Sequence, residues 1–212
     1  MTLLLALDTS TSTASVAVYD GERVLSETTW LAGREHSSRL LVEAQMALAR
    51  ISLTNVDLSG LVVARGPGSF TGVRVALSLA KGIAAALHVP VWGVSSLDAL
   101  ARAARDSAIP VRALLEAGRG RYATALYRGD ECIQPPRLAT IDQLLELIEQ
   151  PTLVIGELNT EARARLSHTP NVELASVAAC ARRAAFLAEL GWLSAQRGDP
   201  GDVHLLDAIY IS

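Results

Sequence analysis

The sequence contains little cysteine and no excess of basic charge, and each shortage excludes a class of protein. Its 212 residues include two cysteines, Cys132 and Cys180, which form neither a CxxC pair nor a dense framework. We expect two reduced thiols and no disulfide scaffold. The 19 basic residues, of which only Lys81 is a lysine, are outnumbered by 22 acidic ones, and the net charge is −3. Proteins that bind nucleic acid alone usually carry a basic surface, so any nucleic acid should be held by a partner.

Long hydrophobic runs are also missing. The run Leu3–Leu7 ends at Asp8, and no basic segment precedes it, so no signal peptide is expected. The run Gly82–Val94 contains His88 and Pro90 and is shorter than a membrane span. We therefore expect a cytoplasmic protein that does not contact a membrane.

Motifs of several enzyme classes are absent. The sequence has no GxSxG elbow and no P-loop of the form GxxxxGK[ST], so it matches neither of these hydrolase and nucleotide-binding classes. The histidines show neither HxxxH nor HExxH spacing, which argues against a zinc or iron site and against a metalloprotease. We predict no catalytic residue and no metal ligand in this chain. The four histidines are His36, His88, His168 and His204.

Strand and helix patterns alternate along the chain. The first half predicts the order βββαβαβα, with an Asp20-Gly21 turn in the first hairpin. The second half repeats part of this order, with a loop at Pro135-Pro136 and a long alanine-rich helix over 176–196. An antiparallel start followed by alternating elements predicts an α/β fold with mixed sheets covered by helices. We expect an actin-like, ribonuclease H-like fold of duplicated βββαβα lobes, 1–106 and 107–212, the second one shortened.

The residues after the first strand are the first candidate site. Asp8, Thr9 and Ser10 offer a carboxylate, hydroxyls and backbone N–H groups, which can hold a hydrated cation or a phosphate. The same residue types also form turns in which side chains satisfy the local backbone. The sequence leaves both interpretations open.

A glycine-rich turn, Arg65–Gly72, is the strongest local feature. It leads from a predicted strand into the start of a helix, where N–H groups can face an anion. Gly66 and Gly68 are therefore weak candidates for binding a cofactor. A tight connection between strand and helix explains the same glycines equally well.

Small and apolar residues recur at steps of four on two predicted helices. Such residues share one helix face, and small ones allow close backbone approach. This face packs either against the chain's own sheet or against helices of another chain, in a four-helix arrangement. We predict it as a partner interface. Its residues are Leu40, Ala44 and Leu48 on the first helix and Gly72, Ala76, Ala80 and Ala84 on the second.

Four segments together resemble the TsaB family, densely over residues 3–105 and loosely afterwards. They are LALDTSTSTASVAV, REHSSRLL, GPGSFTGVRVALSLAKGIA and PVWGVSSLDALA. The resemblance implies an accessory subunit of the bacterial machinery that makes threonylcarbamoyladenosine in tRNA. It also implies a TsaD-like catalytic partner, a TsaE-like ATPase in the complex, and contact with tRNA only through them. Alone, the chain would be a monomer or a homodimer.

The same resemblance bears on metal and nucleotide. The metal-binding histidines of the related catalytic chains would fall on Ser96 and Leu100, which cannot replace imidazole ligands. The expected adenosine loop falls on 154–159, where only Gly156 is a glycine. We therefore expect no cofactor on the isolated chain, and ATP or ADP only in the assembled complex. The rival function is an ATP-dependent phosphotransferase or ATPase of the actin-like fold that uses Asp8 and the glycine-rich turn.

Overall fold

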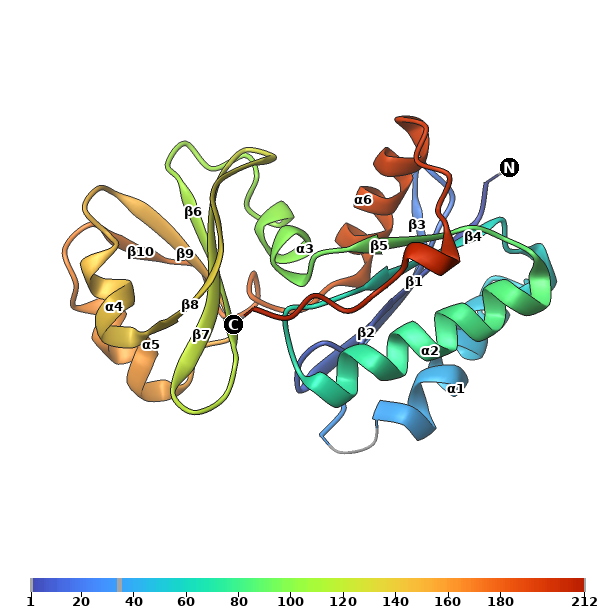
Figure 1. Cartoon of the computed structure of the whole chain (residues 1–212), viewed down its shortest axis with the longest axis horizontal. Coiled ribbons are helices and arrows are strands. Elements are labelled where there is room, and N and C mark those ends of the chain that lie inside the picture. Colours follow the sequence, from blue (N-terminus) through green and yellow to red (C-terminus); the bar gives the residue numbers. More distant parts are fainter. Residues whose placement is uncertain (1, 34–35, 212) are drawn as a thin grey trace. The chain divides into compact units, whose positions relative to one another are not determined.

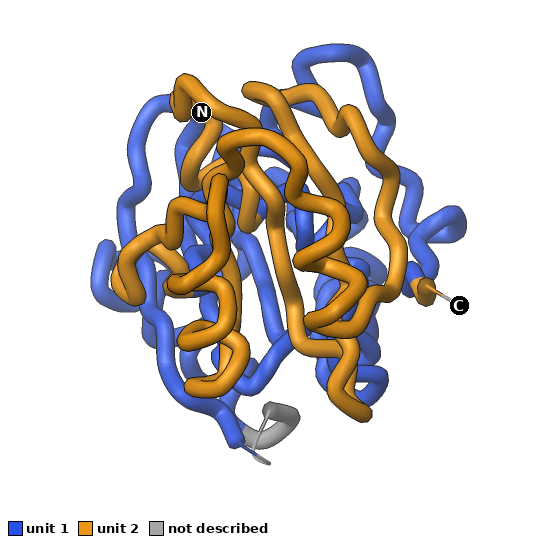
Figure 2. The backbone as a smooth tube through the Cα atoms, turned by 90° about the vertical axis from the view of Figure 1, so that its left-hand side faces the viewer, with its two compact units in different colours: residues 1–99, 182–209 blue, residues 100–181, 210–212 orange. Residues whose placement is uncertain are grey.

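The computed structural model describes residues 2–33 and 36–211, and for residues 36–38 the backbone only. Arg34 and Glu35 of the REHSSRLL segment thus lie outside the described residues, as does the side chain of His36. The chain forms two compact units, residues 1–99 with 182–209 and residues 100–181 with 210–212 (Figure 2).

The first unit is built on a five-stranded mixed sheet in the order β3-β2-β1-β4-β5. β1 pairs antiparallel with β2 and parallel with β4, so the hairpin strands lie on one side of β1 and the crossover strands on the other. β1 and β4 are buried along their whole length, which explains their continuous apolar sequences. The strands are β1 (Leu4–Asp8), β2 (Thr13–Tyr19), β3 (Val24–Leu31), β4 (Gly60–Ala64) and β5 (Val91–Val94).

Helices cover both faces of this sheet (Figure 1). α1 (His36–Ala49) and α2 (Phe70–Leu87) pack on the face that carries Leu5, Leu7 and Val63. α6 (Ala184–Gln196), which follows the second sheet in the chain, packs on the opposite face against Leu4, Ala6 and Val62. The unit also contains two short 3-10 helices, η1 (Asn55–Asp57) and η2 (Val203–Leu205), and the start of α3 (Ser96–Arg102).

The second unit repeats the strand order of the first. Its sheet runs β10-β9-β6-β7-β8, with β6 antiparallel to β7 and parallel to β9. The helices α4 (Ile141–Glu146) and α5 (Thr160–Ser167) contribute to a core with Leu114, Tyr122 and Val154. The strands are β6 (Val111–Glu116), β7 (Arg121–Arg128), β8 (Glu131–Thr140), β9 (Thr152–Gly156) and β10 (Val172–Leu174).

This architecture confirms the predicted α/β, actin-like fold and corrects three details. The second unit is shortened in its helices only, since all five strands are present. The expected loop at Pro135-Pro136 belongs to β8, and α6 begins at Ala184, eight residues later than predicted. The units also differ from the expected lobes 1–106 and 107–212, because the segment 182–209 returns to the first sheet.

One helix in the described part of the chain, α2, is long and apolar enough to cross a membrane, with a mean hydropathy of 1.4 over its 18 residues. The run Gly82–Val94, on which the sequence expectation rests, is too short to span a membrane but includes only the end of α2. Its buried residues face the sheet of the first unit, and it also contacts α1. Its composition is therefore that of a core helix with one face on a sheet.

Candidate functional site

Asp8, the first candidate residue, forms a buried ion pair within the chain. Its carboxylate lies at the end of β1 and pairs with the guanidinium of Arg182; both side chains are 2% exposed. The other carboxylate oxygen accepts hydrogen bonds from Ser10 N (2.9 Å) and Ser10 Oγ (2.6 Å). Arg182 also donates to the Ser96 carbonyl (2.9 Å) and to Ser10 Oγ (3.2 Å). The positive charge beside Asp8 thus comes from the chain itself.

The Asp8–Arg182 pair bears on the two interpretations of the turn after β1, a cation or phosphate site and a turn whose side chains satisfy the local backbone. A hydrated cation needs a carboxylate that water reaches, whereas Asp8 is buried and engaged by Arg182 and Ser10. Thr9 is engaged too, because its hydroxyl donates to the carbonyl of Gly72 at 2.6 Å. The geometry therefore favours a turn whose side chains bond within the chain over a site for a cation or a phosphate. Arg182 was not among the predicted site residues.

The glycine-rich turn packs against the same segment. Ser69 N donates to the Ser10 carbonyl (2.6 Å), and Ser69 Oγ caps α2 by accepting from Gly72 N (3.2 Å). A Cβ atom on Gly68 would lie 2.1 Å from the Ser10 carbonyl oxygen, and one on Gly72 would lie 1.9 Å from that of Thr9. Gly66 has a positive φ of 92°. These glycines permit close backbone packing, which favours the tight-connection interpretation over an anion site.

The corresponding connection in the second unit is equally closed. A Cβ on Gly156 would lie 2.0 Å from the Leu114 carbonyl oxygen, and Glu157 N donates to that oxygen at 3.3 Å. Asn159 then caps α5 by accepting from Ala162 N at 2.8 Å. The residues of the expected adenosine loop are occupied in joining β9 to α5.

The seven predicted interface residues lie in the core of the first unit. Ala76 and Ala80 are fully buried, Ala84 is 3% exposed, and Gly72 approaches the Thr9 backbone. Leu40, Ala44 and Leu48 are at most 1% exposed and belong to the same core as β1 and β4. Their spacing serves packing on the chain's own sheet, and Leu40 also lines the groove between α1 and α2.

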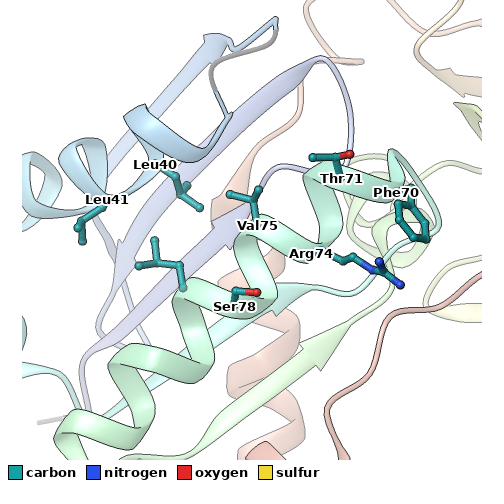
Figure 3. A pocket seen from close by; sticks show the side chains of 8 residues that line it. Leu40, Leu41, Phe70, Thr71, Arg74, Val75 and Ser78 are labelled. Atoms are coloured by element: carbon teal, nitrogen blue, oxygen red, sulfur yellow. The ribbon is translucent and has the colours of Figure 1, made fainter.

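The neighbouring faces of the same helices are exposed and apolar. Leu41, Val42 and Met46 on α1 are 40 to 50% exposed, and Phe70 on α2 is 55% exposed. Between the helices runs a largely apolar groove of about 540 Å³, to which α2 contributes Val75 and Leu79 (Figure 3). The Arg74 guanidinium lies 3.7 Å from the centre of the Phe70 ring at one end. We call the exposed residues Leu41, Val42, Met46 and Phe70, with the groove, the α1/α2 face.

The residues described by the structure contain no group of three or more histidine, cysteine or acidic side chains suited to a metal ion. His88 and His168 are C-caps of α2 and α5, and His204 lies in η2. Ser96 and Leu100, at the positions of the expected histidines, are buried in α3. Cys132 is exposed and Cys180 is buried, and they form no disulfide in the described part of the chain.

Comparison with known proteins finds relatives whose names refer to threonylcarbamoyladenosine in tRNA. The family model for TsaD, tRNA N6-adenosine threonylcarbamoyltransferase, matches residues 29–190. The tRNA threonylcarbamoyladenosine biosynthesis protein TsaB of Bacillus subtilis is 33% identical over 160 residues, covering 72% of this chain and 70% of the relative. TsaB of Escherichia coli is 37% identical over 130 residues, 60% of this chain and 56% of that protein.

A solved structure agrees over the full length. An uncharacterized protein from Pseudomonas aeruginosa, described as similar to the peptidase YeaZ, superimposes with a TM-score of 0.82 at 25% identity. The alignment covers 100% of both chains. The sequence relatives and the shared fold point to the same family.

Proposed function

Because this chain belongs to the TsaB family, we propose that it is a non-catalytic subunit in the formation of threonylcarbamoyladenosine in tRNA, and that it binds a TsaD-like catalytic chain. The α1/α2 face carries the proposal. Four large apolar side chains on two adjacent helices are exposed beside an apolar groove. Exposed apolar patches of this kind are typical of protein–protein interfaces.

The partner we propose has the same kind of helices. The match to the TsaD family model indicates that TsaD-like chains share this architecture, so a partner offers an equivalent helix pair. Two such pairs form a four-helix arrangement, with the groove between α1 and α2 receiving partner side chains. The same face supports a homodimer when the catalytic chain is absent.

Internal features support a role without catalysis. Asp8 is paired with Arg182, and the connections that follow β4 and β9 are filled by backbone packing. The transfer of the threonylcarbamoyl group from its adenylate to tRNA is therefore assigned to the partner, with a TsaE-like ATPase in the complex. ATP or ADP binds, in this proposal, only once the complex is assembled. This assignment also stands against a peptidase activity, to which the name of the Pseudomonas relative refers.

The test of partner binding uses charge on the α1/α2 face. The double variant Leu41→Glu/Met46→Glu should fold, because both side chains are exposed. It should bind the TsaD-like chain from the same organism at least about 100-fold more weakly than the wild type, because uncompensated charges would be buried in the joint. Val56→Glu, at a 79% exposed apolar position in η1 and outside α1 and α2, is the control and should bind normally. Unchanged affinity of the double variant, measured by calorimetry, would exclude this face.

The rival function is tested on the isolated chain. We expect no ATP hydrolysis and no ATP binding by calorimetry, whereas an active phosphotransferase or ATPase must bind its nucleotide. ATP binding with a micromolar dissociation constant would favour the phosphotransferase or ATPase, if an Asp8→Asn variant that remains folded no longer binds ATP.

A further inference from the structure

An arginine is buried in the second unit and forms no ion pair with any described residue. Arg112, on the central strand β6, is 2% exposed. Its register neighbours on β7 and β9 are Leu126 and Val154, which are 4% and 1% exposed. Its Nη2 donates a hydrogen bond to the amide oxygen of Gln134 on β8, at 2.8 Å. The guanidinium thus reaches across β7 to the edge strand β8.

Further polar groups lie on the same face of the sheet. Thr124 on β7 is the register partner of Leu114, two residues along β6 from Arg112, and is therefore a diagonal neighbour of Arg112. Arg137 on β8 lies opposite Thr124. We call Arg112, Thr124, Gln134 and Arg137 the Arg112 cluster. Gln134 and Arg137 are exposed on the edge strand, so solvent reaches the cluster from that side.

Two donors of the cluster are unused. Arg112 Nε and Thr124 Oγ1 are buried and have no hydrogen-bond partner. Thr124 is fully buried, and buried hydroxyl groups without a partner are costly. Two orphaned donors on neighbouring strands, facing the same side of the sheet, indicate that an acceptor belongs between them.

The charge of the cluster has the same implication. Among the residues that the structure describes, no carboxylate forms an ion pair with Arg112 or Arg137. Burial and, to a smaller extent, the nearby positive charge of Arg137 together lower the pKa of Arg112 to about 10. Buried charges are normally compensated by a partner of opposite sign. Here two positive charges face each other across β7 without one.

We propose that the Arg112 cluster is a binding site for a phosphate group, either free or as a phosphomonoester. A phosphomonoester carries a charge close to −2 at neutral pH, which balances two guanidinium groups. Its oxygens accept from the two unused donors, Arg112 Nε and the Thr124 hydroxyl, and from the exposed guanidinium of Arg137. A carboxylate supplies one negative charge and leaves the other arginine uncompensated. The site lies in the second unit and does not depend on the proposed function.

Titration of the full chain with inorganic phosphate at low ionic strength tests the site. Calorimetry should give a dissociation constant on the order of 1 mM. Arg137→Ala should weaken phosphate binding at least tenfold and Thr124→Val about threefold. Arg119→Ala, which removes the same charge at the opposite end of the β6–β7 hairpin, is the control and should leave binding unchanged. Acetate should bind at least tenfold more weakly than phosphate.

Arg112→Met separates binding from a structural role. If the charge of Arg112 is compensated only by a bound anion, this variant should unfold at the same or a higher temperature than the wild type in phosphate-free buffer. The reason is that the variant no longer buries an uncompensated charge. It should also lose the rise in unfolding temperature that phosphate gives to the wild type. A lower unfolding temperature without phosphate would overturn the proposal. Equal phosphate affinities of the Arg137→Ala and Arg119→Ala proteins would overturn it as well.

Glucose 1-phosphate and inorganic phosphate distinguish the two sources of the group. If the two ligands compete for the wild-type protein and neither binds the Arg137→Ala protein, the site accepts phosphate esters as well as the free ion. Binding of inorganic phosphate alone supports a site for the free ion.

Discussion

Asp8 and Arg182 are neighbours in space although 174 positions separate them in the chain. Replacing Arg182 by Met leaves the buried carboxylate of Asp8 without its cation, and we expect a loss of about 3 to 5 kcal/mol of unfolding free energy. Urea denaturation measures this loss. Arg183→Met is the matched control, since Arg183 pairs with Glu27 at 2.7 Å in an exposed position, and it should cost less than about 1 kcal/mol.

The double variant Asp8→Asn/Arg182→Met completes the argument. If the cost comes from the unpaired charge, the double variant should be more stable than Arg182→Met alone, which a double-mutant cycle quantifies. Equal stability of the two would show that Arg182 acts through packing and not through its charge.

At this scale the sequence indicated which residue types matter but not their partners. Asp8, Thr9 and Ser10 were identified by their place after a strand, and all three are engaged in the turn. No local signal identifies Arg182, because it lies in a segment predicted as helix and acts across the fold. The Arg112 cluster was missed for the same reason: its members come from three strands, and only register brings them together.

Among the elements, α2 carries two glycines with opposite roles. Gly72 faces the Thr9 carbonyl, and a methyl group there would lie 1.9 Å from a backbone oxygen. Gly82 has open space around its Cβ position in the same helix. We expect Gly72→Ala to destabilise the protein by at least about 1 to 3 kcal/mol through overpacking. Gly82→Ala should stabilise it by about 0.5 to 1 kcal/mol, because alanine restricts the unfolded chain.

Thermal and urea unfolding of the two variants measure this difference. A stable Gly72→Ala protein would show that the turn between β4 and α2 adjusts without cost. It would also reopen the anion-site interpretation of that turn.

Hydrophobic periodicity predicted the helices α1 and α2 correctly, but it placed the start of α6 eight residues too early. The strand β8 was missed because Pro135 and Pro136 cannot donate to a sheet ladder and are typical of loops. β8 is an edge strand, and the two prolines lie where its register with β7 shifts, a position that tolerates the missing donors. On α1 and α2, periodicity identified the small-residue face but could not tell whether it meets the chain's own sheet or a partner.

The whole molecule depends on the return of α6 to the first sheet. A fragment that ends at residue 106, the predicted lobe boundary, lacks this helix and exposes the apolar face formed by Leu4, Ala6, Val62 and Trp92. We expect it to aggregate or to bind a hydrophobic dye strongly. Residues 1–99 joined to 182–209 by a flexible linker should be soluble and cooperative in thermal unfolding. A soluble, cooperative 1–106 fragment would contradict the division into units.

This return also sets the order in which the protein matures on the ribosome. β5 ends at Val94, but α6 begins only at Ala184, so 89 residues are made after the first sheet is complete and before its second layer exists. At typical rates of synthesis this interval lasts roughly 5 to 18 seconds. Throughout it, the nascent chain presents one uncovered sheet face to its surroundings while the second sheet emerges. Chaperones that recognise apolar strands on nascent chains can therefore bind this protein during a defined and long interval of its synthesis.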